Sequence, residues 1–197
     1  INLDYPKDGK FSFFSWSPDE TKIAYTNTTE AGVELWVVDL NTKKSKKLSE
    51  KYINDILISP FQWFNSGSSL LVSYRCNSDM PLIKSVPSGP IIQQTNNQNA
   101  PSRTYQDLIK NKNDEILFEY YSCVELHKVS INGSDSKIVD RGMIKDYDIS
   151  PGQDYLLVKK IKKPFSYLVP YYRFPYEVKT INICLLYTSD AADDCRC

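Results

Sequence analysis

The stretch FSWSPDETKIAYT (Phe14–Thr26) predicts the fold of this chain. It places an aromatic residue and a tryptophan before a turn, and an apolar strand after it. In the turn Ser17-Pro18-Asp19, proline holds φ near −65°, and the Ser and Asp side chains can bond to the backbone of the turn. A tight turn between two short apolar segments indicates a β-hairpin.

The same pattern recurs further along the chain. FQWFNSGSSLLVSY (Phe61–Tyr74) and YDISPGQDYLLVK (Tyr147–Lys159) each place an aromatic residue, then Trp or Ile two residues later, a turn and an apolar strand. A second pair, ELWVVDLNTKKSKKL (Glu34–Leu48) and ELHKVSINGSDSKIV (Glu125–Val139), is typical of strand, Asn-led turn and strand. Asn132-Gly133 in the latter is a strong two-residue hairpin signal.

The spacing of these segments suggests a period. Trp16 and Trp63 are 47 residues apart; Trp63 and Ile149 are 86 apart, or two steps of 43; the two glutamates that open the second pair are 91 apart. A period of about 40–50 residues with about four short strands is typical of β-propeller blades, which must stack on one another to bury their faces. We predict an all-β fold, a partial β-propeller of about four blades of four-stranded antiparallel sheet, over residues 1–183.

One segment interrupts this rhythm with a helical pattern. SRTYQDLIKNKNDEILFEYY (Ser102–Tyr121) has apolar residues at helical spacing. We expect two short helices or turns here, with Asn113 or Asp114 as a cap, leading into a strand near Ser122. This segment is the short helical insertion of the predicted propeller.

A second segment interrupts the rhythm with prolines. KKPFSYLVPYYRFP (Lys162–Pro175) holds three prolines and five aromatic residues. Because proline cannot donate a ladder hydrogen bond, we expect an insertion loop rather than a central strand. YEVKTINI (Tyr176–Ile183) then resumes the strand pattern, in the place that VELWVVDL takes in the first repeat.

The last stretch, CLLYTSDAADDCRC (Cys184–Cys197), differs in character from the rest. Reverse translation of Cys184–Asp193 allows TGT CTC TTA TAC ACA TCT GAC GCT GCC GAC, which resembles the transposon-end adapter of short-read sequencing libraries. We therefore expect residues 184–197 to be a translated adapter, the alternative being a natural acidic tail, and exclude them from fold reasoning. Since Ile1 is not a start residue, we expect a fragment of a longer chain.

Composition excludes several classes of function. The whole chain has 24 basic and 24 acidic residues, and the body without the tail is about +2, with no basic surface of the kind that nucleic acid requires. No apolar run reaches the ~18 residues of a membrane span. Only Cys76 and Cys123 lie in the body, as free thiols or a single bridge, and no metal-ligand spacing or cofactor motif is present. We therefore expect no metal, no cofactor, no nucleic-acid partner and no membrane span.

The two interrupting segments carry a resemblance to a known family. GPIIQQTNNQNAPSRTYQDLIKNKNDEILFEYY (Gly89–Tyr121), followed by the Pro-rich insertion, resembles the N-terminal propeller of prolyl oligopeptidase-type (S9) serine peptidases, in the glutamyl endopeptidase-like branch. Lys163 stands where that family usually has Arg, and Asn65-Ser66 replaces Pro-Asp. The resemblance covers most of the body. It implies that this chain is part of the non-catalytic propeller of a peptidase. The implied partners are a C-terminal α/β-hydrolase domain of the same full-length chain and a peptide substrate, which would be cleaved after Glu.

The chemistry of that family is missing from this chain. None of the seven glycines forms the G-x-S-x-G elbow that carries the serine nucleophile of α/β-hydrolases. The single histidine, His127, lies at a strand position, where a packed strand residue is the alternative to a general base. Because acyl transfer requires a nucleophile and a base together, we predict no catalytic residue in this chain.

The Pro-rich insertion is the best candidate for substrate contacts. Arg173 could pair with an acidic side chain, and Tyr167, Tyr171 and Tyr172 could form the wall of a subsite. The alternative is that these aromatic residues pack the insertion onto its own blade or onto the hydrolase domain. A stand-alone propeller binding or scaffold module is the competing function. We expect a bacterial periplasmic or secreted location rather than the cytoplasm or a plastid.

Overall fold

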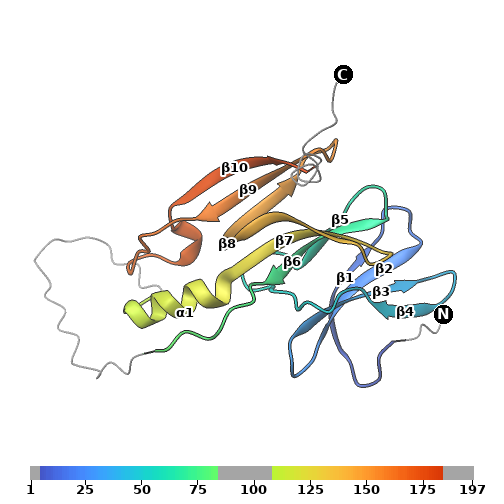
Figure 1. Cartoon of the computed structure of the whole chain (residues 1–197), viewed down its shortest axis with the longest axis horizontal. Helices are drawn as coiled ribbons and strands as arrows, with labels where there is room; N and C mark the ends of the chain where they lie inside the picture. Colours follow the sequence, from blue (N-terminus) through green and yellow to red (C-terminus); the bar gives the residue numbers. More distant parts are fainter. Residues whose placement is uncertain (1–4, 84–107, 184–197) are drawn as a thin grey trace, which may run out of the picture.

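The computed structural model describes residues 5–83 and 108–183 (Figure 1). These residues form ten strands, one α-helix and one 3-10 turn. In chain order the elements are β1 (Lys10–Trp16), β2 (Lys22–Thr28), β3 (Val33–Asp39), β4 (Lys44–Lys47), β5 (Phe61–Trp63), β6 (Ser69–Arg75), α1 (Lys112–Ser122), β7 (Cys123–Ser130), β8 (Asp135–Ile149), β9 (Tyr155–Ile161), η1 (Tyr171–Arg173) and β10 (Tyr176–Asn182).

The strands confirm the all-β fold class and form consecutive antiparallel sheets, as propeller blades do. The first blade is the four-stranded sheet β1-β2-β3-β4. The other sheet has the order β10-β9-β8-β7-β6-β5, and β8 changes partner within it. Its first part, from Asp135 to Met143, pairs with β7, and its last part, from Ile144 to Ile149, pairs with β9. The second blade is therefore β5, β6, β7 and the first part of β8, and the third is the last part of β8, β9 and β10.

The repeat read from the sequence coincides with the blades. Trp16, Trp63 and Ile149 each end the first strand of a blade. The segments that begin at Glu34 and Glu125 are the third strands of the first two blades, and Tyr176–Asn182 is the third strand of the third. The strand assignments of the sequence analysis are thus confirmed.

The number of blades is smaller than the spacing suggested. Between Trp63 and Ile149 the described residues hold the strands of one blade rather than two, because a connection as long as a blade separates β6 from β7. The described residues hold two four-stranded blades and three strands of another, instead of about four blades. Residue spacing cannot distinguish a long insertion from an additional repeat.

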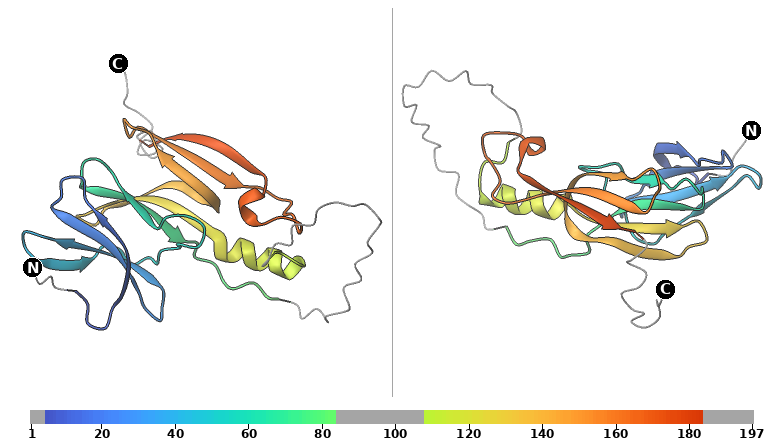
Figure 2. Two further views of the ribbon diagram at one scale, coloured as in Figure 1. Left: turned by 180° about the vertical axis from the view of Figure 1, so that it is seen from behind. Right: turned by 90° about the horizontal axis from the view of Figure 1, so that it is seen from above.

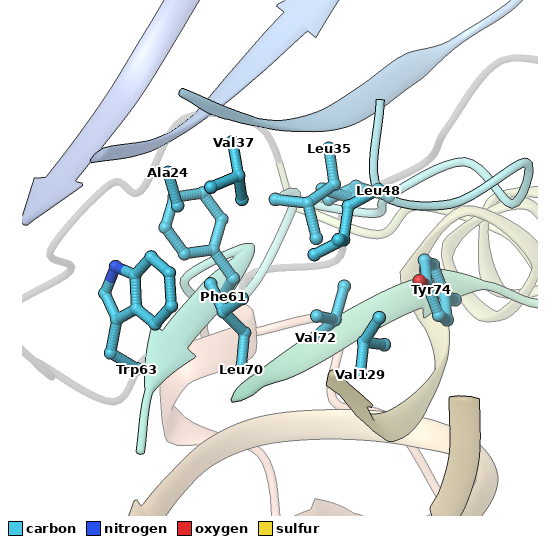
Figure 3. Close-up of a cluster of buried hydrophobic side chains, with 11 residues drawn as sticks. Ala24, Leu35, Val37, Leu48, Phe61, Trp63, Leu70, Val72, Tyr74 and Val129 are labelled. Carbon is cyan, nitrogen blue, oxygen red and sulfur yellow. The ribbon is translucent and has the colours of Figure 1, made fainter. Parts of the chain in front are cut away.

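Two apolar cores hold the three blades together. The first lies between the first and second blades, where Ala24, Leu35 and Val37 face the side chains of β5 and β6 (Figure 3). The second lies between the second and third blades and includes Leu71 and Leu126. Burying such side chains is the main driving force for stacking, about 25 cal/mol per Å² of apolar surface.

The helical insertion differs from expectation in detail. Residues 102–107 lie outside the described residues, and the described part forms one helix, α1, rather than two. Its N-cap is Asn111, whose side chain accepts a hydrogen bond from the backbone N–H of Asp114 at 3.0 Å, so the expected cap at Asn113 or Asp114 is wrong. The strand predicted near Ser122 is confirmed, since β7 begins at Cys123.

The two cysteines of the body form a disulfide. Cys76 follows β6, Cys123 begins β7, and their Cα atoms are 5.6 Å apart. The bridge therefore closes the base of the connection that carries α1 (Figure 1). Of the two states left open by the sequence, the structure has the bridged one.

Candidate functional site

Helix α1 and the Pro-rich insertion emerge from the same edge of the propeller. The helix lies in the connection between the second and third strands of the second blade, and Lys162–Pro175 lies in the equivalent connection of the third blade. Because antiparallel strands alternate in direction, equivalent connections of neighbouring blades lie at the same edge. Figures 1 and 2 show α1 beside η1 at this edge, and we call α1 with Lys162–Pro175 the insertion platform.

Aromatic rings join the two halves of the platform. The Phe118 ring of α1 lies 5.3 Å from that of Phe165 and 5.7 Å from that of Phe174, both edge-on, and Phe165 stacks on Phe174 at 5.4 Å. Phe165 and Phe174 belong to a buried cluster with Met143 of the second blade and Ile161 of the third. The platform is therefore anchored where these two blades meet, by a core of its own.

Polar contacts reinforce this junction at the surface. The Tyr167 hydroxyl donates to Glu115 Oε1 at 2.7 Å, and Lys163 pairs with Glu119 at 2.5 Å. The hydrogen bond with Lys112 and then that with Tyr167 lower the pKa of Glu115. The same hydrogen bond raises the pKa of Tyr167, because the Glu115 carboxylate accepts the phenol proton and so stabilises the protonated phenol. Near neutral pH these shifts favour an ionised Glu115 and a protonated Tyr167, the states in which the hydrogen bond forms.

The four residues predicted for substrate binding lie together on this platform but in different environments. Tyr167 bonds to α1, and Tyr171 lies in loose ring contact with Phe118 at 6.3 Å. Tyr172 lies within η1 and Arg173 at its end, and both residues are exposed. The carbonyl oxygen of Tyr172 accepts a hydrogen bond from Lys145. Tyr167 and Tyr171 thus pack the insertion against α1, which belongs to the connection of the neighbouring blade. A subsite wall formed by all four stays a prediction.

A cleft at the foot of the platform was missed by the sequence analysis. It has a volume of about 530 Å³. Met143, Ile161 and Ile116 supply apolar lining, and Arg141 and Lys160 supply positive charge. Its acidic lining residues are Asp79 and Glu119. The lining comes from four separate parts of the chain, so no local sequence motif could have indicated it.

His127 is a buried strand residue rather than an accessible base. The residue is 4% exposed, with Nδ1 2.6 Å from Asp135 Oδ1 and an edge contact of its ring to the Tyr74 ring at 5.1 Å. Burial raises the pKa of Asp135, but the hydrogen bonds from Lys51 and His127 outweigh it and lower the pKa overall. The packed reading of His127 is confirmed, and the pair fastens β7 to β8.

Within the described ranges, neither α1 nor η1 has the length and hydropathy of a membrane-crossing helix. In the same residues, no three His, Cys, Asp or Glu side chains gather as a metal site would require.

Comparison with curated proteins finds two relatives along most of the chain. The probable chloroplastic glutamyl endopeptidase of Oryza sativa subsp. japonica is 33% identical over 186 residues, which is 89% of this chain and 20% of that protein. The protein of the same name from Arabidopsis thaliana is 31% identical over 184 residues, 88% of this chain and 19% of that protein. The chain thus spans about one fifth of the length of these relatives. No protein-family model matches it.

Solved structures with similar chain traces include two proteins from Pyrococcus species. Acylaminoacyl peptidase from Pyrococcus horikoshii has a TM-score of 0.48 and 16% identity, over 86% of this chain and 23% of that one. The β-propeller domain of the Trilobed protease from Pyrococcus furiosus has a TM-score of 0.45 and 15% identity, over 86% and 39%. Taken with the blade topology, the similarity to the two plant proteins supports a propeller-like region of the kind found in prolyl oligopeptidase-type (S9) peptidases, in the glutamyl endopeptidase-like branch.

Proposed function

We propose that this chain is the non-catalytic propeller part of a serine peptidase whose α/β-hydrolase domain lies in the same, longer polypeptide. The observation that carries the proposal is the similarity to glutamyl endopeptidases over 89% of the chain, which amounts to only 20% of the rice protein. The chain has no G-x-S-x-G elbow, so the serine nucleophile would come from outside these residues.

The insertion platform would line the opening between the propeller and the hydrolase domain. Its two halves come from neighbouring blades, emerge at one edge and are tied by rings and by the Lys163–Glu119 pair. A rigid projection of this kind favours steric control of access, which admits peptides and excludes folded proteins. The single-turn η1 would present Tyr172 and Arg173 to the substrate.

Preference for glutamate would rest on a cation of this region. Arg173 can hold a carboxylate by two parallel hydrogen bonds, which makes the pair geometrically selective. Arg141, which lines the cleft, is the second arginine of this region, and comparing the two arginines identifies which one acts.

The disulfide supports a periplasmic or secreted location. Bridges such as Cys76–Cys123 persist in oxidising compartments and are rare in the cytosol. Fractionating the source cells and mapping the bridge under non-reducing conditions tests this part of the proposal. Recovery of the parent protein from the cytoplasm with both thiols reduced would contradict it.

The decisive experiment begins with long-read sequencing of the source locus, followed by purification of the parent protein. We expect the reading frame to continue into a hydrolase domain, and the protein to cleave peptides after Glu faster than after Gln or Lys. Arg173→Gln should raise KM for the Glu peptide about tenfold, the cost of one charge-assisted hydrogen bond, while leaving cleavage of the Gln peptide unchanged. Arg141→Gln is the parallel variant: if it raises KM for the Glu peptide and Arg173→Gln does not, Arg141 is the arginine that acts.

One outcome would reject the proposal as a whole, and another would reject only the glutamate preference. A frame that ends without a hydrolase domain makes a stand-alone propeller binding module the better account. A parent that cleaves Glu and Gln peptides equally rejects the glutamate preference, but leaves the peptidase assignment in place.

A further inference from the structure

The cleft at the foot of the insertion platform lies where the second and third blades separate. β8 pairs with β7 up to Met143 and with β9 from Ile144, so the sheets of the two blades diverge at this point. The last residues of β8 before this change and the end of β9 form one wall of the cleft, and α1 forms another. The cleft volume of about 530 Å³ is within the range of small-molecule sites, ~300–1,000 Å³.

Positive charge gathers on the wall that the strands form. The ammonium of Lys160 donates a hydrogen bond to the carbonyl oxygen of Arg141 at 3.0 Å. Gly142 permits this approach, because a Cβ atom at that position would collide with the Lys160 side chain. The ammonium has two further donors, and the Arg141 guanidinium forms no ion pair within residues 5–83 and 108–183. Two cations with unused donors therefore line this wall.

Apolar side chains adjoin these cations. Met143 and Ile161 line the cleft beside the two cations, and Ile116 lines it from α1. A ligand that carries a carboxylate and an apolar side chain on the same carbon atom would contact the charged and the apolar surface together. The last residue of a peptide has this arrangement when it is apolar, as leucine is.

Carboxylates line the rest of the cleft. Asp79 belongs to the segment that follows Cys76, and Glu119 belongs to α1. Glu119 already pairs with Lys163, whereas Asp79 forms no ion pair with any of the described residues. The two cations and two carboxylates of the lining balance. A ligand without net charge is therefore favoured over a peptide with several acidic residues, because the carboxylates of the lining would repel the latter.

We propose that this cleft binds the C-terminal end of a short peptide with an apolar last residue. The free α-carboxylate pairs with Arg141 and Lys160, and the last side chain lies on Met143 and Ile161. In a dipeptide, the ammonium group is attracted by Asp79. This site goes beyond the proposed function, because it recognises a chain end that carries no glutamate and involves no hydrolase domain.

Calorimetric titration with four peptides tests the class of ligand. In the 197-residue chain, Leu-Leu should bind, and Leu-Leu amide should bind at least about tenfold more weakly, the cost of one charge-assisted hydrogen bond. Acetyl-Leu-Leu keeps the carboxylate and should lose less affinity than the amide. Acetyl-Leu-Glu amide has a carboxylate only on its side chain and should bind as weakly as Leu-Leu amide.

Substitutions locate the site in the chain. Arg141→Gln should weaken binding of Leu-Leu about tenfold and leave binding of Leu-Leu amide unchanged. Gly142→Ala keeps both cations but displaces Lys160, and should weaken binding of Leu-Leu about threefold to tenfold. Arg75→Gln, the same change at an exposed arginine outside the cleft, is the matched control and should leave all four affinities unchanged. Melting curves show that each variant folds, and the peptide series in the unsubstituted chain decides the ligand class even where one does not.

Each contrary outcome overturns the inference. If Leu-Leu does not bind, or binds no better than its amide, the cleft does not recognise a chain end. If acetyl-Leu-Glu amide binds best, the two cations serve an acidic side chain. The longer parent protein should give the same order of affinities, and loss of Leu-Leu binding there would show that the cleft is closed in the whole molecule. Peptidase activity is not the readout: an inactive parent that binds Leu-Leu through Arg141 supports this site and counts only against the peptidase proposal.

Discussion

At the scale of single residues, the turns that begin each hairpin join the blades to one another. Asp19 accepts hydrogen bonds from Ser17 at 2.5 Å and Thr21 at 2.8 Å within its own turn. The same carboxylate lies against Gly67 of the next blade, where a Cβ atom would be 3.0 Å from its Cγ. In the third blade, the Gln153 side chain accepts from the backbone N–H of Asn65 at 3.0 Å. A local turn motif thus also sets the contact between blades.

We predict that Asp19→Ala lowers the melting temperature at neutral pH but not in strong acid. Hydrogen bonds from Ser17 and then Thr21 hold the pKa of Asp19 well below its usual value. A carboxylate with a lowered folded-state pKa stabilises the fold above its unfolded pKa of about 3.9, and this stability disappears as pH falls through the folded pKa. Melting curves of both proteins from neutral to acidic pH check this. Glu30→Ala, an exposed carboxylate nearby, is the control, and a difference that persists in strong acid would contradict the electrostatic cause.

We predict that Gly67→Ala destabilises the chain by about 1–2 kcal/mol. Gly67 has φ +62°, which L-residues with a Cβ seldom adopt, and the added methyl group would press on Asp19. Urea denaturation measures the loss. Combining Gly67→Ala with Asp19→Ala separates the two causes, because only the steric part is relieved when the carboxylate is absent. Strictly additive losses would show that backbone strain alone is responsible.

At the scale of elements, the platform connects two insertions that are 40 residues apart in sequence. Phe118 of α1 contacts Phe165 and Phe174 of the Pro-rich insertion. The disulfide closes the base of the α1 connection, with 47 residues of separation between Cys76 and Cys123. The helix is therefore held by the bridge at its C-terminal end and by aromatic packing at Phe118.

We predict that Cys76→Ser reduces stability by about 2–4 kcal/mol, because opening a loop of this length restores conformational freedom to the unfolded chain. Urea denaturation with and without dithiothreitol measures it. The reductant should lower the stability of the unsubstituted chain by the same amount and leave Cys76→Ser unchanged. Equal stability of the unsubstituted chain in both conditions would show that the bridge contributes nothing.

At the scale of the whole molecule, the second blade supports both cores. Its β6 strand directs Leu70 and Val72 toward the first blade and Leu71 toward the third. Loss of packing in this strand therefore affects the whole stack rather than one blade. The third blade has the opposite character, because its outer face, with Leu157 and Val178, is exposed.

We predict that Leu71→Ala and Leu157→Ala have very different effects although the two leucines are equivalent in the repeat. Each follows the residue that pairs with the end of the first strand of its blade. Leu71 is fully buried, so its truncation should cost about 2–5 kcal/mol, whereas truncating the partly exposed Leu157 should cost less than about 0.5 kcal/mol. Thermal unfolding of the 197-residue chain compares them. Similar losses would mean that the outer face is covered in the chain itself.

We also expect this chain to associate in solution as its concentration rises. The apolar outer face and the unpaired strand edges favour contact between molecules. Light scattering over a hundredfold range of concentration tests this, and Val178→Lys should reduce the association. A chain that stays monomeric throughout and melts cooperatively would count against the expectation that it is a fragment.

By itself, the sequence determined the hairpin turns, the strands that flank them, the aromatic and Pro-rich insertions and the absence of a nucleophile elbow. These features depend on residues near one another in the chain, where proline, glycine and alternating apolar side chains act directly on the backbone. Only the tertiary structure decided the number of blades, the bridge between Cys76 and Cys123, the cleft at the foot of α1 and the exposure of Leu157 beside the burial of Leu71. Each of these depends on which surfaces meet in space, and equivalent residues of a repeat differ only in whether a neighbouring sheet lies against them.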